Sequence, residues 1–532
     1  MKIILIQPPI EDFYCTPQRI QPTGLIYIAS YLASKKIECE IIDLLYPAKP
    51  RRIPIESELK YLQEYYPEDS SPFRIFSDYF RFGKTAGETA DVIKKSEADV
   101  YGISSNFTAY YKTAAETAKI IKSIFPDKPI IIGGNNAQVM YEYFLSENFV
   151  DFVVFNEGER TLEELLNNLD YPEKVSNIAY KKNGNIVKTE IKNNYNINDT
   201  FFKIDHVHSL KYSIGRDRMM SIVTSRGCPY SCGFCSANNN VFGYTRKSID
   251  IVKEELKYNI SKFNITALNF EDENFTAAPY EYLNELCGLV KNNFPGMRLF
   301  FMNGLHYVNL DDDMLKLLRS TGMKNLNISI VDVKSSDYGR ITDIEKLRKL
   351  VKAAKLMDMI VTVYFILGMP GQTIEDIIET IGLLLELDIV LGPSIFYPLP
   401  FLKICKKNEM QDIAYSQMRM TALSVEKSGF SRRDIMTLFR FCRIANLKKT
   451  MKSNLIKNIL IDQCANSIGY SVIKPERDEI ADFLLNRMIK DNSIYGIKNE
   501  VLKNNKYQFE YFPHCQNSEL LKKSLEIFHN KW

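Results

Sequence analysis

A short stretch at 226–236, Arg-Gly-Cys-Pro-Tyr-Ser-Cys-Gly-Phe-Cys-Ser, constrains this chain more than any other feature. It places Cys228, Cys232 and Cys235 at the spacing C-x3-C-x2-C. Thiolates are soft ligands that suit iron–sulfur clusters, and a cubane cluster takes four ligands. Three cysteines in one loop therefore leave one iron without a protein ligand. The glycines and the proline between them allow tight turns and stiffen the loop, so the stretch predicts a [4Fe-4S] site with one open iron.

The alternative interpretation is that these are three free thiols that happen to lie close together. The spacing and its glycine and proline frame make that alternative the weaker one. The chain has ten cysteines, and the other seven are scattered along it. Scattered cysteines fit a reducing cytoplasm better than a disulfide framework, and an oxygen-sensitive cluster fits the same compartment.

Length and composition set the class of protein. A chain of 532 residues is too long for one core and indicates two to four domains. The hydrophobic fraction of 45% and the charged fraction of 25% are typical of a globular protein, and the net charge of +3 gives no case for a nucleic-acid partner. The most apolar segment, 381–396, is interrupted by Glu386 and Asp388, which argues against a membrane span. The apolar start of the chain predicts a first strand and not a signal peptide.

The first 170 residues alternate short apolar runs with amphipathic stretches. Strands are predicted at 2–7, 39–44, 99–104, 129–132 and 152–155, and helices at 24–34, 86–95, 111–124, 138–146 and 159–169. This βαβ order predicts an α/β domain over 1–170 with a flavodoxin- or Rossmann-like doubly wound parallel sheet. The segment 46–85 is longer than a simple connection. It either helps to cover the active site or is a surface excursion.

Small and polar residues follow the strands of this predicted sheet. Ligands of such sheets bind beyond the carboxyl ends of the strands. The residues expected there are Gln7, Pro8, Pro9, Ser104, Ser105, Asn106, Gly133, Gly134, Asn135, Asn136, Asn156, Glu157 and Gly158. Taken singly they are more typical of ordinary strand-to-helix turns than of a ligand site. Taken as a set they predict a surface for a large polar ligand.

The rest of the chain divides into three parts. Residues 171–215 predict a hairpin and linker, and residues 216–400 predict a second series of strands and helices. Its strands are expected at 220–225, 267–270, 299–303, 325–330, 361–367 and 394–397, which makes a partial (β/α)6 barrel with the cysteine loop at its mouth. Residues 401–532 predict a mainly helical domain, with helices at 412–427, 431–450 and 477–490.

The cysteine loop resembles the cluster loop of the radical S-adenosylmethionine (SAM) superfamily. The N-terminal strand ends, above all 7–9, 132–134 and 153–159, resemble the cobalamin-binding domain of the cobalamin-dependent radical SAM proteins. The resemblance implies three cofactors: a [4Fe-4S] cluster, SAM and cobalamin. Many cobalamin proteins place a histidine under the cobalt, but the first 200 residues here contain none. This domain therefore cannot supply a histidine ligand to the cobalt.

The resemblance also assigns SAM contacts. In the family an aromatic residue before the third cysteine contacts adenine, which here is Phe234, and the second-strand end holds the methionine amino group. The corresponding SAM-binding residues are Phe234, Glu271, Asp272, Glu273, Asn274, Ser329, Asp332, Ile366 and Gly368. Two positions depart from the family pattern. The fourth-strand end around Ser329 and Asp332 differs, and Gln372 stands where a glutamate is common.

The resemblance implies a methyltransferase that methylates an unactivated carbon. In such enzymes a 5′-deoxyadenosyl radical abstracts hydrogen and the substrate radical takes the methyl group of methylcobalamin. The substrate would be a small molecule or peptide, and a flavodoxin or ferredoxin would supply single electrons. The same architecture also hosts cyclisation, ring contraction and oxidation without methyl transfer. A non-catalytic iron–sulfur protein is the alternative from another class. A methylthio-transferring RNA-modifying enzyme needs three further cysteines in the N-terminal domain, which has only Cys15 and Cys39.

Overall fold

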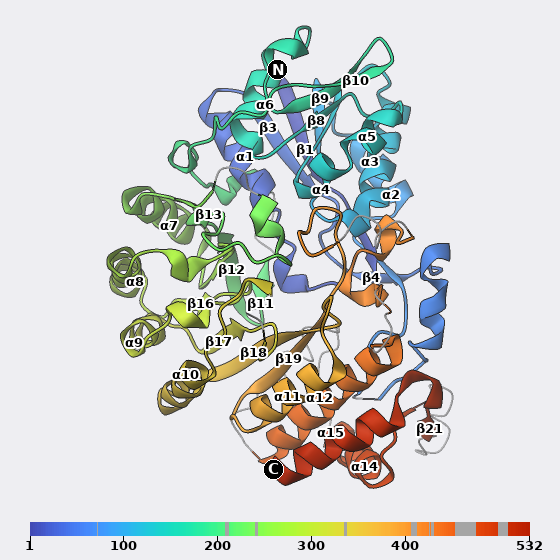
Figure 1. Cartoon of the computed structure of the whole chain (residues 1–532). Helices are drawn as coiled ribbons and strands as arrows, with labels where there is room; N and C mark the ends of the chain where they lie inside the picture. The colour runs from blue at the N-terminus through green and yellow to red at the C-terminus, as the bar shows by residue number, and fades with distance from the viewer. Residues whose placement is uncertain are drawn as a thin grey trace.

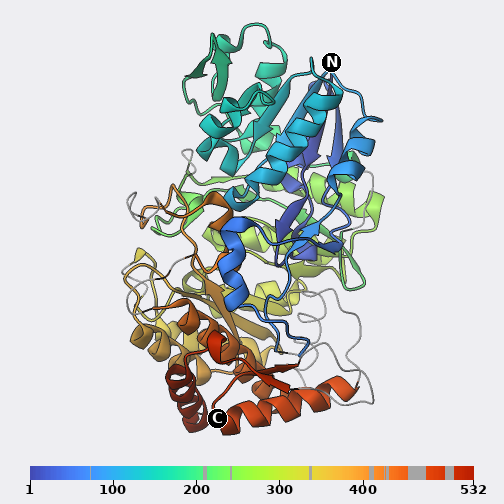
Figure 2. The same ribbon diagram turned by 90° about the vertical axis from the view of Figure 1, so that its right-hand side faces the viewer.

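The computed structural model describes residues 1–71, 73–207, 212–239, 243–334, 338–405, 412–424, 426, 430–452, 475–497 and 509–531. The N-terminal sheet lies at one end of the molecule, the second series of strands lies in the middle, and the C-terminal helices lie at the other end (Figure 1). The view turned by 90° shows the same order from end to end (Figure 2). No helix of the described residues is long and apolar enough to cross a membrane.

The described residues of the N-terminal region form a seven-stranded sheet in the order β10-β9-β8-β7-β6-β1-β3. Five strands are parallel, namely β3 (Glu38–Asp43), β1 (Lys2–Gln7), β6 (Val100–Ser104), β7 (Ile130–Gly133) and β8 (Phe152–Val154). The helices are α1 (Thr23–Ser34), α2 (Ala86–Ile93), α3 (Tyr111–Ile124), α4 (Asn135–Val139), α5 (Tyr141–Ser146) and α6 (Gly158–Leu166). The predicted α/β class with a doubly wound parallel sheet is confirmed.

Strand β1 shows why the sequence folds in this way. It pairs in parallel with β3 on one side and β6 on the other, and Ile3, Ile4, Leu5 and Ile6 are all buried. A strand covered on both faces has no polar side to alternate with, so an unbroken apolar run suits it.

The segment expected as a hairpin and linker extends this sheet. Strands β9 (Ile178–Lys182) and β10 (Asn185–Lys188) form the hairpin, and β9 pairs antiparallel with β8. The hairpin therefore adds two strands to the edge of the N-terminal sheet.

The middle region forms a partial barrel. Among the residues described, six parallel strands follow one another: β12 (Asp217–Ile222), β15 (Ala267–Phe270), β16 (Arg298–Phe300), β17 (Asn325–Ser329), β18 (Ile360–Leu367) and β19 (Val390–Ile395). Single parallel bridges, Leu299 to Met323 and Leu305 to Ile328, join β16 to the β17 side. The outer helices are α7 (Ile249–Phe263), α8 (Tyr280–Asn293), α9 (Asp312–Ser320), α10 (Ile344–Leu356) and α11 (Ile374–Leu385). This is the predicted six-unit architecture.

The described part of the barrel region also contains two short antiparallel strand pairs. Strand β11 (Ser213–Ile214) pairs with β12, and β13 (Ser225–Arg226) pairs with β14 (Thr245–Arg246). Strand β13 matters most for function, because it lies directly before the cysteine loop.

The C-terminal region is mainly helical, as expected. It contains α12 (Arg432–Lys452), α14 (Pro475–Asp491) and α15 (Ser518–Lys531), together with the short antiparallel pair β20 (Tyr495–Ile497) and β21 (Phe509–Tyr511).

The helix predicted over 412–427 is wrong for the described residues 412–424. They contain only two 3-10 turns, η12 (Tyr415–Gln417) and η13 (Met420–Ala422), and positions 425 and 427 lie outside the described residues. Arg419 explains the difference, because its buried guanidinium donates to the carbonyl oxygens of Ser416 at 2.6 Å and Ala109 at 3.4 Å. Contacts with the N-terminal region thus override the local helical pattern.

The insertion at 46–85 packs against this same C-terminal segment. It forms β4 (Pro50–Arg52), η2 (Ser57–Glu64) and β5 (Phe80–Phe82), and β5 pairs with both β4 and β2 (Ile10–Asp12). Tyr66 donates a hydrogen bond to the carbonyl of Thr421 at 2.7 Å, and Gln417 donates to that of Glu58 at 2.8 Å. Figure 2 shows the blue η2 beside the orange C-terminal segment. The insertion is therefore a structural brace between distant parts of the chain.

Candidate functional site

The three cysteines line one cavity at the carboxyl ends of the barrel strands. Its volume is about 80 Å³. Besides Cys228, Cys232 and Cys235, its walls are Tyr230, Ala237, Glu273, Asn274, Asn303, Gly304, Leu305, His306, Ser329 and Arg340. The predicted second-strand residues Glu273 and Asn274 and the predicted fourth-strand residue Ser329 therefore face the cysteines.

Backbone contacts fix the cysteine loop. Gly227 has φ +79°, a left-handed conformation that glycine adopts without strain, and its N–H donates to the Glu273 carboxylate at 3.0 Å. Gly233 donates to the carbonyl of Tyr338 at 3.1 Å and accepts from the N–H of Ile404 at 3.2 Å. A Cβ at Gly233 would lie 2.6 Å from Cγ2 of Ile404. Both glycines are therefore required by close approach or by turn geometry.

The cysteine set fits a cubane cluster better than a single ion. In the described part of the chain, no three His, Cys, Asp or Glu side chains gather as they would around one metal ion. Three thiolates spread around one cavity suit a cubane, because each then binds a different iron. Burial raises the pKa of the Cys232 and Cys235 thiols, so cluster binding would displace their protons. Among the described residues no fourth cysteine lines this cavity, which fits a cluster with one open iron.

The residues at the end of the second barrel strand, β15, make different contacts. Asn274 donates its amide to the sulfur of Cys228 at 3.5 Å. Asp272, only 2% exposed, instead accepts from the hydroxyls of Thr224 at 2.8 Å and Ser225 at 2.5 Å. Burial raises the pKa of Asp272 to about 6. Asp272 therefore holds the strand before the cysteine loop and does not line the cavity.

Glu271 also lies outside the cavity wall. Its carboxylate accepts from Arg19 at 2.8 Å and from the amide of Asn269 at 2.5 Å. Arg19 comes from the N-terminal region, so this predicted SAM contact serves as an interdomain contact.

Arg340 brings a positive charge to the cysteines. Its Nη2 donates to the hydroxyl and to the carbonyl of Ser329, each at 2.9 Å. Burial lowers its pKa, and the three cysteine thiols act in the opposite direction, which places the guanidinium within electrostatic reach of all three. Its buried Nε has no hydrogen-bond partner in the structure described.

His306 forms another wall of the cavity. Its ring stacks on Tyr230 of the cysteine loop, with centroids 4.6 Å apart and planes 11° apart. Burial, together with the positive charges of Arg340 and Lys346, lowers the pKa of His306 to about 4. The imidazole is therefore neutral near pH 7, and its buried Nδ1 has no hydrogen-bond partner among the described residues.

The predicted adenine contacts pack in an apolar cluster next to the loop. Phe234 and Ile366 are both partly buried against Val331, Met369, Phe396 and Leu402. Gly368 has φ +83°, and its N–H donates to the side-chain oxygen of Gln372 at 2.8 Å.

Gln372 in turn donates its amide to the carboxylate of Asp332 at 2.8 Å. The buried Asp332 is therefore a support for the turn after β18, away from the wall of the cysteine cavity. The glutamine that departs from the family pattern is what allows this contact, because a glutamate would have no donor to offer Asp332.

The N-terminal strand ends form a cradle. Gly134 has φ +109°, and a Cβ there would lie 2.5 Å from Oδ1 of Asn106 and 2.7 Å from the carbonyl oxygen of Ser105. Asn136 donates to the hydroxyl of Ser105 at 2.8 Å. The Asn136 Oδ1 and the Asn156 Nδ2 are buried and have no hydrogen-bond partner in the described structure. Two orphaned polar atoms at one sheet edge fit a polar ligand there.

Other predicted residues of this edge either make contacts within the fold or lie exposed. The amide of Gln7 donates to the carbonyl of Ile20 at 2.7 Å and to Asp43 at 3.0 Å, and Pro8 and Pro9 are buried. Ser104 accepts from the Asn106 amide at 3.2 Å. Asn135 and Asn106 are exposed beside Gly133. Gly158 lets α6 begin close to α1, because a Cβ there would lie 3.0 Å from Cδ1 of Ile28.

Glu157 points to the cysteine loop. Its carboxylate pairs with Nη1 of Arg226, and Glu159 pairs with Nη2 of the same guanidinium at 2.8 Å. The sequence predicted Glu157 as a contact of the N-terminal ligand, whereas the structure also joins it to the residue two positions before Cys228.

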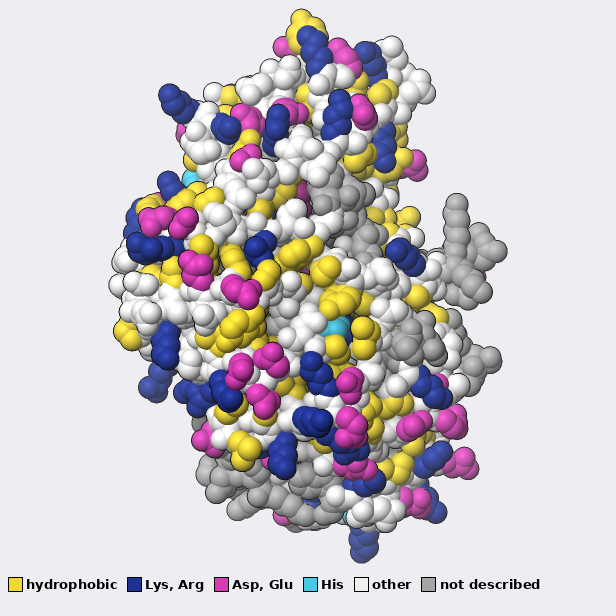
Figure 3. Space-filling model, turned by 60° about the vertical axis from the view of Figure 1, so that its left-hand side comes forward, with side chains coloured by type: hydrophobic (Ala, Val, Ile, Leu, Met, Phe, Trp, Pro, Cys, Tyr) yellow, Lys and Arg dark blue, Asp and Glu magenta, His cyan; other side chains and the backbone are white. Residues whose placement is uncertain are grey.

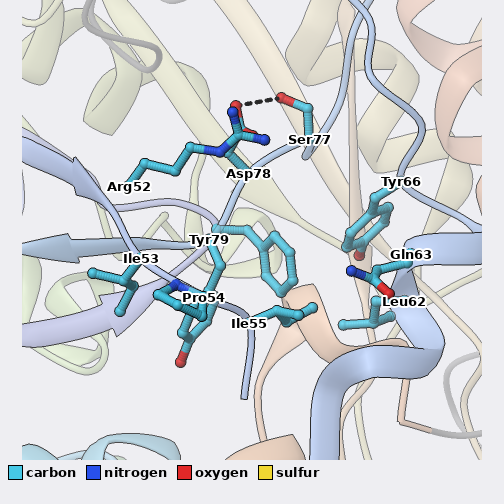
Figure 4. A pocket seen from close by; sticks show the side chains of 11 residues that line it. Arg52, Ile53, Pro54, Ile55, Leu62, Gln63, Tyr66, Ser77, Asp78 and Tyr79 are labelled. Carbon is cyan, nitrogen blue, oxygen red and sulfur yellow. Dashed lines mark hydrogen bonds and ion pairs between the residues drawn. The ribbon is translucent and has the colours of Figure 1, made fainter. Parts of the chain in front are cut away.

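A second cavity of about 220 Å³ lies within the insertion (Figure 4). Phe13, Tyr66 and Tyr79 form its aromatic side, and Arg52 and Asp78 pair at 2.7 Å at its polar side. The described residues that line it are all different from those that line the cysteine cavity. On the face drawn in Figure 3, side chains of both charge signs are interspersed, in line with the small net charge.

Sequence reasoning missed several cavity residues. Asn303, Gly304, Leu305 and His306 follow the third barrel strand, so the strand-end rule already applied to its neighbours could have found them. Arg340 had no such signal, because it lies in the connection after β17 and no motif marks it.

Two family models match the chain. The radical SAM superfamily model matches residues 222–384, and the B12 binding domain model matches residues 81–166. The first range contains all three cysteines, and the second contains the strand ends at 104–106, 133–136 and 156–158. The predicted combination of a radical SAM domain with a cobalamin-binding domain is confirmed.

Curated relatives fall into two activity classes. The chain is 24% identical over 427 residues to cytidylyl-2-hydroxyethylphosphonate methyltransferase of Streptomyces wedmorensis, which covers 70% of this chain and 75% of that protein. It is 20% identical over 331 residues to anaerobic magnesium-protoporphyrin IX monomethyl ester cyclase of Cereibacter sphaeroides, which covers 59% and 54%.

Solved structures share the fold. The radical S-adenosylmethionine methyltransferase TsrM from Kitasatospora setae, solved with cobalamin and a [4Fe-4S] cluster, gives a TM-score of 0.57 at 16% identity over 76% of this chain and 73% of that one. The cobalamin-dependent S-adenosylmethionine radical enzyme OxsB, solved with aqua-cobalamin and S-adenosylmethionine, gives 0.58 at 14% identity over 99% and 78%.

The Asp332–Gln372 contact gives a testable prediction. Gln372→Glu should destabilise the protein by about 1–3 kcal/mol near pH 8, because it replaces a buried donor with a second carboxylate facing Asp332. Lowering the pH to 5 should reduce the loss, since the carboxylate pair can then hold a proton. Urea unfolding midpoints measure both effects. The double variant Asp332→Asn with Gln372→Glu restores a donor–acceptor pair and should recover stability. Equal urea midpoints for the wild type and Gln372→Glu at pH 8 would show that this contact does not contribute to the free energy of unfolding.

Proposed function

From the pairing of a radical SAM domain with a B12-binding domain in this one chain, we propose that the protein is a cobalamin-dependent methyltransferase that acts on an unactivated carbon. The observation that carries the proposal is the position of the cysteine cavity. It lies at the carboxyl ends of the barrel strands, and the loop that forms it is joined through Arg226 to the edge of the N-terminal sheet. The likeness to a curated methyltransferase supports methyl transfer.

The residues divide among three cofactors. Cys228, Cys232 and Cys235 would hold a [4Fe-4S] cluster, and the cradle around Gly134 and Asn156 would hold cobalamin. When bound, the cluster and SAM would supply a radical able to abstract hydrogen, and cobalamin would supply the methyl group. The protein itself binds, orients and shields these groups. An oxygen-sensitive cluster would favour a reducing compartment such as the cytoplasm for this enzyme.

Arg340 is a candidate contact for the carboxylate of SAM. It lines the cysteine cavity, where the amino-acid end of SAM would approach the open iron. Its Nη2 is held by Ser329, which aims the guanidinium, and its Nε has no hydrogen-bond partner in the described structure. A guanidinium binds a carboxylate through strong charge-assisted hydrogen bonds. Glu273 and Asn274 would face the amino group from the second strand.

His306 is a candidate polar contact in the same cavity. Its stacking on Tyr230 fixes the ring plane, and Tyr230 is itself held by a hydrogen bond from its hydroxyl to Asn309 at 2.8 Å. A neutral imidazole adds no positive charge beside Arg340 and keeps one nitrogen able to accept a hydrogen bond. We assign it to orientation of SAM or of a substrate group.

The substrate class is a small molecule or a peptide. TsrM has been solved with tryptophan as its substrate and with a SAM analogue. The chain would also need an external one-electron donor, such as a flavodoxin or ferredoxin, because cleavage of SAM to a radical consumes one electron.

The second candidate function is cyclisation, ring contraction or oxidation without methyl transfer. The likeness to an anaerobic ester cyclase favours it as the alternative. The same three cofactors would be bound, so the products distinguish the two functions.

Anaerobic reconstitution of the full chain tests the proposal. We expect the protein to take up iron, sulfide and hydroxocobalamin, and with SAM and a reductant to form S-adenosylhomocysteine together with 5′-deoxyadenosine, measured by mass spectrometry. Formation of 5′-deoxyadenosine alone would favour the second function. Absence of cobalamin uptake would refute both. Cys228→Ala is the control, because loss of one cluster ligand should abolish 5′-deoxyadenosine formation.

The role of Arg340 has its own test. Arg340→Gln removes the charge, and we expect the dissociation constant for SAM to rise about 10-fold or more, as the loss of a charge-assisted hydrogen bond implies. Iron content should stay at the wild-type level. The control is Arg348→Gln on α10, where the arginine pairs with Glu386. Equal SAM affinity in Arg340→Gln and the wild type would remove Arg340 from the site.

A further inference from the structure

Arg226 lies between the two cofactor regions. It is the last residue of β13, two positions before Cys228. Its guanidinium pairs with Glu157 and with Glu159, both from the start of α6 in the N-terminal sheet domain. The ring centroids of Tyr195 and Tyr27 lie 4.8 Å and 5.4 Å from the guanidinium carbon. Two carboxylates and two aromatic rings therefore hold the cation.

The network is buried. The side chain of Arg226 is 13% exposed, and those of Glu157 and Glu159 are 25% and 2% exposed. Burial and the nearby carboxylates of Glu159 and Glu273 raise the pKa of Glu157, and Arg226 acts in the opposite direction. Desolvation makes such a network a poor source of net stability, and removing one partner is costly because it leaves the others buried and unpaired. The benefit of the network is therefore that it fixes the geometry of its members.

A continuous path of contacts runs from the corrin cradle to the cysteine cavity. Asn156, whose Nδ2 is one of the orphaned atoms, has φ +57° and directly precedes Glu157. Glu157 pairs with Arg226. The next residue, Gly227, donates its N–H to the carboxylate of Glu273, which lines the cysteine cavity. Each step is a covalent neighbour, an ion pair or a hydrogen bond.

Simple attachment of the two domains does not require this path. Gln21 already pairs with both the N–H and the carbonyl of Ser221, at 3.1 and 2.9 Å. Tyr27 does the same with Val223, at 3.1 and 3.0 Å. These contacts hold the strand upstream, whereas the Arg226 network adds contact at the cysteine loop itself.

We propose that Arg226 is a positioning residue through which occupancy of the corrin cradle sets the geometry of the cysteine loop. The proposal rests on the proposed function, because it requires cobalamin in the cradle and SAM in the cavity. A corrin that contacts 156–158 would restrict the side chain of Glu157, and Glu157 would then hold Arg226 in place. Because Gly227 follows Arg226 and donates to Glu273, the position of Arg226 also sets that wall of the cysteine cavity. Binding at one site that orders a shared element favours binding at the other. Cobalamin therefore tightens SAM binding.

Equilibrium dialysis of SAM against the reconstituted full chain, without reductant, tests this coupling. In the wild type we expect hydroxocobalamin to lower the dissociation constant for SAM at least about fivefold, the lower end of typical couplings between sites. In Glu157→Gln, which keeps the side-chain size and an acceptor oxygen, the ratio of the SAM dissociation constants without and with cobalamin should fall toward one. Because Glu157 itself borders the cradle, the variant is compared with the wild type at saturating hydroxocobalamin and equal iron content. The EPR spectrum of the reduced cluster should respond to cobalamin in the wild type and not in Glu157→Gln.

A control and a gentler variant complete the experiment. Glu56→Gln removes a carboxylate charge 3.7 Å from another buried arginine, Arg419, and Glu56 accepts its hydrogen bonds from Tyr79 and Lys112 of the N-terminal region. It should keep the wild-type ratio. Glu157→Asp keeps the charge and shortens the side chain, so it should give an intermediate ratio even if Glu157→Gln does not fold.

Three results would overturn the inference. Suppose that the wild-type protein binds both cofactors but that cobalamin does not change its dissociation constant for SAM. That result would refute the coupling and leave the proposed function intact. A wild-type ratio in both Glu157 variants would remove Arg226 from the coupling. A wild-type protein that takes up no cobalamin would refute the coupling and the proposed function together.

Discussion

Side chains of the N-terminal domain bind the backbone of the strand that carries the cysteine loop. Gln21 occupies both hydrogen-bonding groups of Ser221, and Tyr27 occupies both of Val223. These side chains supply to the strand the kind of contact that a neighbouring strand would give. Asp272 then holds Thr224 and Ser225 from the barrel side, and Arg226 meets Glu157 and Glu159. The position of the cysteines is therefore set jointly by both domains.

This joint support explains the placement of charge in the molecule. Two largely buried guanidinium groups lie where separate parts of the chain meet. Arg226 joins the N-terminal sheet to the cysteine loop, and Arg419 joins the C-terminal segment to the Asp12 region, 3.5 Å from its carboxylate. Such groups contribute little net stability, but they tolerate few alternative geometries. A reaction that needs two cofactors at a fixed separation benefits from that restriction.

The sequence was most informative where local pattern and tertiary environment agree. Strand β1 has the predicted bounds of 2–7, because an unbroken apolar run is stable only in a strand that is covered on both faces of the sheet. The segment 412–424 failed as a helix because Arg419 and Thr421 bind partners hundreds of residues away. In the site, Asn274 and Ser329 face the cysteines, whereas Asp272 and Asp332 support loops behind them. A motif fixes which residues lie near a site, but not which way each side chain turns. Arg340 shows the remaining limit, since only the folded chain brings it to the cysteines.

The proposed function requires that the cluster and the corrin share one rigid interface. The most direct measurement is the EPR signal of cob(II)alamin in the reconstituted protein, recorded with the cluster oxidised and then reduced. If both cofactors face that interface, the unpaired spin of the reduced cluster should broaden or split the cobalt signal, with a single set of splittings. A cobalt signal that does not change when the cluster is reduced would contradict the claim.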